Sequence, residues 1–194
     1  MLEMTDKRAP ATSTTPVSTA TTSYITMSSA PMKFRPDGGV DWGNMWDTFC
    51  ILAQDGGPPH RGTMLQAPEN PDPYHPDYEF ALHEIIRGIW EVSGLSAQAA
   101  NPGWVSVTCA SPEMARWLFD AIQQENVCAR CERSRLFLPV GGHFTLKGEI
   151  KNVITVVAKT THYWQAHVSQ DVKRVLAIEE KFGEIKAQLK TWFG

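Results

Sequence analysis

The chain has 194 residues, of which 42% are hydrophobic and 20% are charged, and its net charge is −3. These proportions are close to those of globular domains, so the sequence can bury a core and is not disordered throughout. It contains no run near the ~18 consecutive apolar residues of a membrane-spanning helix, and it does not open with a charged-then-apolar leader. Four cysteines are too few for a disulfide scaffold. We therefore expect a soluble, cytoplasmic protein.

The charge is divided unevenly along the chain. Residues 1–36 contain four basic and two acidic side chains, whereas the rest contains 14 basic and 19 acidic ones. Proteins that bind nucleic acids gain most of their affinity when lysine and arginine neutralise phosphates. The net-negative body therefore argues against nucleic acid as a partner, and the lack of an apolar span argues against a membrane.

The N-terminal segment is rich in serine and threonine, which supply 12 of the 20 residues in 11–30. Such a segment buries too little apolar surface to offset the entropy lost on ordering. We predict a disordered tail over 1–36 and a single α+β domain over 37–194. A transit peptide is an alternative that the acidic residues of the segment disfavour. A second alternative is a start of translation at Met27 or Met32.

The next segment predicts a helix, a short strand, a loop and a second helix. Asp41 is a suitable N-cap for a helix that ends at Gly56. Residues 63–67 have the composition of a short strand, and four prolines make 68–76 a loop. Apolar residues at helical spacing predict a helix over 77–93, which a glycine ends.

The middle of the chain alternates strand and helix signals. Residues 104–109 alternate at period two and predict a strand, and Ser111 is an N-cap that precedes a proline at the first helical position. Residues 127–132 and 136–138 predict a hairpin. This order of elements predicts an α+β fold, with a small mixed sheet of three to five strands and helices packed over one face.

The C-terminal segment repeats apolar residues at alternating spacings of four and three. Eleven of the thirteen positions are apolar: Ile150, Ile154, Val157, Thr161, Trp164, Val168, Asp171, Val175, Ile178, Phe182, Ile185, Leu189 and Trp192. An average spacing of 3.5 residues is the coiled-coil period. One straight helix of this length would span about 64 Å, which is longer than a small domain. We expect a break near Ser169 and a helical arm from about that residue, with a strand over 152–157 as an alternative for the first half.

The apolar face of this arm requires a cover, which is either the protein's own sheet or a second chain. We expect the sheet to cover the helix around Phe182 and the outer end to reach a partner. The predicted partner interface is Phe182, Ile185, Leu189 and Trp192. The leading hypothesis is a non-catalytic accessory or assembly protein that acts through protein–protein contacts, either as a homodimer or with another protein.

A glycine- and proline-rich loop over 56–62 supports an alternative function. It presents His60 and Arg61, and His143 follows a second glycine pair. An arginine fork binds carboxylate or phosphate, and a histidine exchanges protons near neutral pH. The alternative is a protein or enzyme that binds a small anionic ligand through these three residues. The sequence has no nucleotide, hydrolase or zinc-protease motif, so it indicates no cofactor and leaves any catalytic residues unknown.

Two cysteines and two histidines have the residue types of a zinc site. They are Cys128, Cys131, His162 and His167, and 30 residues separate the pairs. The usual separation is about 12–15 residues, so we predict no metal site.

The chain contains seven tryptophans. Trp42, Trp46 and Trp104 are predicted to fill the core. Trp90 and Trp117 lie off the apolar stripes of their helices, so they are candidates for exposed side chains that anchor a partner.

Overall fold

The structure is a computed structural model that describes residues 32–45 and 62–193. Most of the helix predicted to begin at Asp41 lies outside these residues, as do the predicted tail up to residue 31 and the side chains of His60 and Arg61. The remaining predictions can be compared with the structure element by element.

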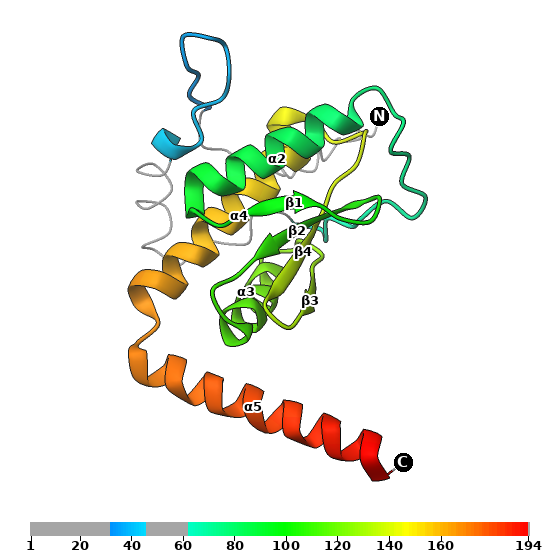
Figure 1. Cartoon of the computed structure of the whole chain (residues 1–194). Coiled ribbons are helices and arrows are strands. Elements are labelled where there is room, and N and C mark those ends of the chain that lie inside the picture. Colours follow the sequence, from blue (N-terminus) through cyan, green and yellow to red (C-terminus); the bar gives the residue numbers. More distant parts are fainter. Residues whose placement is uncertain (1–31, 46–61, 194) are drawn as a thin grey trace, which may run out of the picture.

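The centre of the molecule is a four-stranded sheet (Figure 1). Its strands are β1 (Ala97–Ala99), β2 (Trp104–Thr108), β3 (Arg130–Glu132) and β4 (Arg135–Pro139), in the order β1-β2-β4-β3. All neighbouring strands in this sheet pair antiparallel. The expectation of a mixed sheet is therefore wrong about strand direction. The strand predicted over 63–67 forms only one parallel bridge, between Leu65 and Val127. The Leu65 amide donates a hydrogen bond to the Asn126 carbonyl, and the Leu65 carbonyl accepts one from the Cys128 amide.

Two of the predicted helices are confirmed near their predicted bounds. The helix α2 (Tyr78–Ser93) ends at Gly94, whose φ of 69° is the left-handed conformation that favours glycine at a helix end. The helix α3 (Pro112–Gln124) begins after Ser111, whose hydroxyl accepts a hydrogen bond from the Met114 amide at 3.3 Å. The α+β class is therefore confirmed.

One face of the sheet packs against the helices. Val105 and Val107 of β2 and Leu136 and Leu138 of β4 are fully buried in the same core as the apolar side chains of α2 and α3. Side chains alternate between the two faces of a strand, so the residues that alternate with these four along β2 and β4 point to the opposite face of the sheet. The period-two pattern of 104–109 therefore correctly predicts the strand and its buried side.

A central helix, α4 (Lys151–His162), contacts both α2 and α3. Every residue from 151 to 161 is buried, and π-helical turns η3 (Leu146–Ile150) and η4 (Tyr163–His167) extend the helix at its two ends. The alternative of a strand over 152–157 is therefore wrong. The valines and isoleucine of α4 lie on one broad face of the helix, where they pack in the core, and this packing outweighs their weaker helix propensity.

The segment 32–45 packs against α2. Trp42 is fully buried, and its indole Nε1 donates a hydrogen bond to Glu84 at 2.9 Å. The neighbouring Glu91 pairs with Arg35 at 2.8 Å. Residues 32–36, which composition assigns to the tail, thus contribute Arg35 to this contact. A short 3₁₀ turn, η2 (Gly43–Met45), ends the segment.

The last element is α5 (Gln170–Phe193), which runs below the body in Figure 1. Val168 has an extended backbone, with φ −78° and ψ 116°, and separates η4 from α5. The Ser169 hydroxyl accepts a hydrogen bond from the Val172 amide at 3.3 Å and so caps the new helix. The break predicted near Ser169 is confirmed.

Candidate functional site

The first half of α5 is attached to the body through α3. Leu176 is partly buried against the core, and the Lys173 ammonium lies 5.1 Å from the centre of the Trp164 ring. Trp164 in turn contacts Trp117 of α3, with ring centres 5.7 Å apart. These contacts fix which side of α5 faces the protein.

The opposite side of α5 carries an apolar surface that we call the α5 stripe. Its members are Val175, Ile178, Phe182 and Ile185, and each is between 51% and 60% exposed. At 3.6 residues per turn, the centre of the stripe lies about half a turn from Lys173 and Leu176, which face the body. The expectation that the sheet covers Phe182 is therefore wrong, because α5 packs on α3 through its other side.

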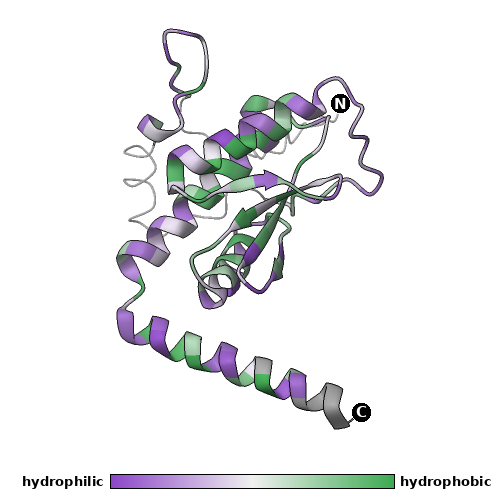
Figure 2. Ribbon diagram, viewed as in Figure 1, coloured by the Kyte–Doolittle hydropathy of each residue, from purple (hydrophilic) through white to green (hydrophobic). Residues whose placement is uncertain are grey.

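The second half of α5 extends beyond these attachments. In this half of the helix, the side chains of Lys181, Phe182 and residues 185–188 are all exposed. Figure 2 shows hydrophobic segments that recur along this helix between hydrophilic ones. Leu189 and Trp192 continue the heptad within α5, but their side chains lie outside the described ones. An isolated helix with a bare apolar face is marginally stable in water, so this surface needs a cover.

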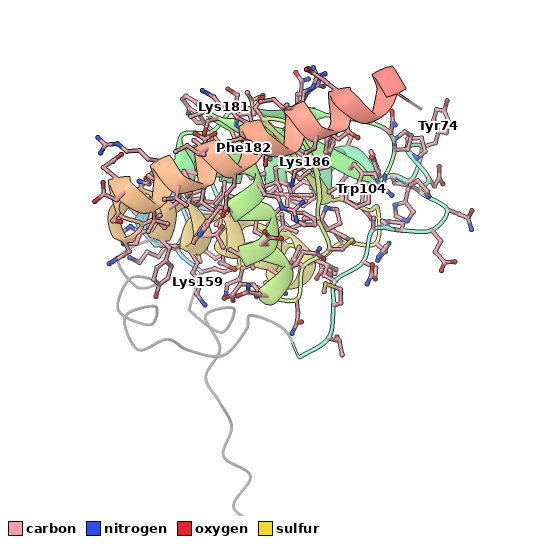
Figure 3. All side chains as sticks on the ribbon, turned by 90° about the horizontal axis from the view of Figure 1, so that it is seen from below. Tyr74, Trp104, Lys159, Lys181, Phe182 and Lys186 are labelled. Atoms are coloured by element: carbon pink, nitrogen blue, oxygen red, sulfur yellow. The ribbon has the colours of Figure 1, made fainter. Side chains whose placement is uncertain are left out.

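Charged side chains flank the α5 stripe on both sides. Glu179 and Lys186 lie along one flank, at the e positions of the heptad, and Arg174 and Lys181 lie along the other, at the g positions. Figure 3 labels Phe182 between Lys181 and Lys186 on the exposed helix. Residues at e and g positions determine the partner and orientation of paired helices.

Of the three predicted ligand-binding residues, His143 lies in the described part of the chain. His143 is exposed in the turn after β4, where its ring meets the Phe144 ring edge to face at 5.0 Å. His60 and Arg61 lie outside the described residues. The alternative function, which depends on that loop, therefore stays a prediction.

The cysteines and histidines considered for zinc are distributed as follows. Nε2 of His162 lies 3.3 Å from Nε2 of His167. Cys131 is partly buried, and this burial raises the pKa of its thiol. Among the residues that the structure describes, His, Cys, Asp and Glu form no group of three or more that can hold a metal ion.

The tryptophans follow the sequence predictions in part. Trp42 lies in the core, as expected, whereas Trp104 is buried on the other face of the sheet, outside the core, with Arg130 over its ring. Trp90 is 60% exposed and is thus available to a partner, whereas Trp117 is partly buried against Trp164. Trp46 lies outside the described residues.

A second feature, which we call the sheet-face hollow, lies on the side of the sheet away from the helix-packed residues. It has a volume of about 300 Å³, and its lining includes Gln98, Trp104, Ser106, Phe137, the two arginines Arg130 and Arg135, and one carboxylate, Glu132. None of these residues was singled out from the sequence as a binding residue.

No family model, curated protein or solved structure matches this chain. None of the helices in the described part of the chain combines the length and hydropathy needed to cross a membrane. Function must therefore be argued from the geometry of the surfaces above.

Proposed function

We propose that this protein is a non-catalytic assembly protein that forms a homodimer through the α5 stripe. The observation that carries the proposal is the orientation of α5, which turns the α5 stripe away from the body. If the domain needed this helix only for its own core, the stripe would face α3 or the sheet. Its outward position is instead that of a helix paired with another helix.

The flanking charges favour a second copy of this chain in an antiparallel orientation. When Phe182 of one helix faces Ile185 of the other, Glu179 of each chain faces Lys186 of the other. The two-fold symmetry forms this attractive contact twice. In the parallel, in-register arrangement, Arg174 would face Glu179 of the other chain, which is attractive, but Lys181 would face Lys186, which is repulsive. The antiparallel arrangement forms its attractive contacts without that repulsion.

The charge of α5 also favours a protein over a lipid surface as its partner. The helix contains five basic and four acidic residues. Helices that lie on anionic membranes carry lysine and arginine in clear excess on the polar face. The near balance in α5 matches an equally balanced second helix.

Sedimentation velocity of the full chain tests the proposal. The wild type should sediment as a dimer that dissociates on dilution, and Phe182→Asp should be a monomer whose body still unfolds cooperatively. Ala187→Asp is the matched control, because it adds the same charge at an exposed position outside the stripe. It should remain dimeric.

Three outcomes would contradict the proposal. One is a wild type that stays monomeric at all concentrations. Another is a Phe182→Asp variant that still dimerises with the wild-type affinity. The last is a monomer whose α5 binds vesicles of anionic phospholipid in a Phe182-dependent manner, because the stripe would then be a membrane-binding surface.

A further inference from the structure

The sheet-face hollow is built from one row of side chains that crosses all four strands. Gln98 pairs with Ser106, Ser106 with Phe137, and Phe137 with Arg130. Directly paired residues point to the same face of a sheet, so these four side chains stand side by side. Arg135, two residues before Phe137 on β4, lies on the same face.

Ser106 is the unusual member of this row. Its residue is 2% exposed, and its hydroxyl has no hydrogen-bond partner although it is buried. A buried hydroxyl without a partner costs about 1–3 kcal/mol, which is why nearly all such groups are paired. Ser106 is one of the residues that line the hollow, and its side chain is on that face of the sheet, so a ligand that enters the hollow can supply the missing partner.

Two arginines provide positive charge at the same place. The Arg130 guanidinium lies 4.0 Å from the centre of the Trp104 ring, which holds it in one orientation. Neither Arg130 nor Arg135 forms an ion pair with any carboxylate in the described part of the chain. The hairpin from 130 to 135 contains three arginines and one glutamate, on a body whose net charge is negative. The charge of this patch is therefore suited to an anion.

We propose that the sheet-face hollow binds a small organic anion in which a carboxylate or phosphate is joined to a flat ring. The arginine forks bind the anionic group, the partly buried Phe137 contacts the ring, and Ser106 pairs with a polar atom of the ligand. The volume of about 300 Å³ is at the lower end for ligand pockets, so the ligand is a small molecule. This site is separate from the α5 stripe and does not depend on dimerisation.

Titration of the full chain, followed by nuclear magnetic resonance, tests the site. The probes are adenosine monophosphate and benzoate, which combine a ring with an anion, and adenosine and inorganic phosphate, which each provide only one part. At least one ring-bearing anion should shift the amide signals of Ser106 and Phe137 and saturate at millimolar concentration or below. It should bind more tightly than either separate part.

Variants assign the binding to the hollow. Arg135→Gln and Ser106→Ala should each weaken binding about tenfold, since each removes one hydrogen bond to a charged or buried group. Arg116→Gln is the matched control, because it makes the same change at an exposed position on α3 and should bind as the wild type does.

The proposal is overturned if neither ring-bearing anion binds at millimolar concentration, or if binding is the same in Arg135→Gln and Arg116→Gln. Inorganic phosphate that binds as tightly as adenosine monophosphate, with no binding of benzoate, would also overturn it, since the ring would then contribute nothing. A single-stranded oligothymidylate that binds where the small anions do not would assign the face to nucleic acid instead.

Discussion

Gly88 of α2 lies against the side chain of Ile154 of α4, so closely that a β-carbon at position 88 would overlap the isoleucine. Glycine weakens a helix by roughly 1 kcal/mol relative to alanine. The close approach explains why it stands in the middle of α2. The crossing of α2 and α4, and with it the burial of α4, depends on this position.

Replacing Gly88 with alanine should therefore lower the free energy of unfolding by about 1–3 kcal/mol, because the buried isoleucine must shift in a filled core. Gly183→Ala on α5 is the control, since the added β-carbon would meet nothing within 4 Å apart from its own stretch of helix. It should leave stability unchanged or raise it by up to about 1 kcal/mol. Urea unfolding measures both, and equal effects would contradict the packing described here.

Removal of residues 1–31 should leave the melting temperature nearly unchanged, because the segment has no apolar periodicity with which to pack. Trp42→Ala should instead lower the free energy of unfolding by about 3–5 kcal/mol, since it empties a fully buried site. Thermal unfolding of the two variants compares them directly. A loss of more than about 2 kcal/mol on removal of the tail would show that the tail is part of the fold.

Ser106→Ala should raise the free energy of unfolding by about 1 kcal/mol, because it removes a buried hydroxyl that lacks a partner. Ser111→Ala should lower it by about 1 kcal/mol, because its hydroxyl caps α3. The same chemical change thus has opposite signs at two sites, and chemical denaturation distinguishes them. A loss of stability in Ser106→Ala would indicate that its hydroxyl is satisfied in the folded protein.

The free energy of unfolding should decrease as the pH falls through the range in which an ordinary histidine gains its proton. Burial and the nearby His167 lower the pKa of His162 below its usual 6.5. The unfolded chain therefore binds a proton before the folded chain does, and the free energy of unfolding decreases from about pH 7.5 towards pH 5.5. In His162→Gln this decrease should be smaller. Urea unfolding at the two pH values measures it, and an identical decrease in both proteins would exclude His162 as its source.

The elements that sequence predicts well have local signals at their ends. Ser111 with the following proline begins α3, Gly94 ends α2, and Ser169 begins α5. Each of these depends on a residue's own backbone preference or hydrogen bond, so no knowledge of distant contacts is needed.

Features that depend on distant packing were not predictable in the same way. The valines of α4 suggest a strand, and only burial against both α2 and α3 explains their helix. The face that α5 turns to the body depends on the backbone of Val168, which no residue preference determines. Alternation in β2 does separate Trp104 and Ser106 from the valines, yet the arginines beside them come from another hairpin.

The central claim, that α5 pairs with α5 of a second copy in antiparallel orientation, is tested most directly by charge reversal. Sedimentation equilibrium gives the dissociation constants of the wild type, Glu179→Lys, Lys186→Glu and the double variant. Each single change should weaken the dimer about tenfold, because two attractive contacts become repulsive and each exposed pair contributes up to ~1 kcal/mol. The double variant should regain the wild-type affinity. Single variants that dimerise as the wild type does, or a double variant as weak as either single one, would contradict this arrangement.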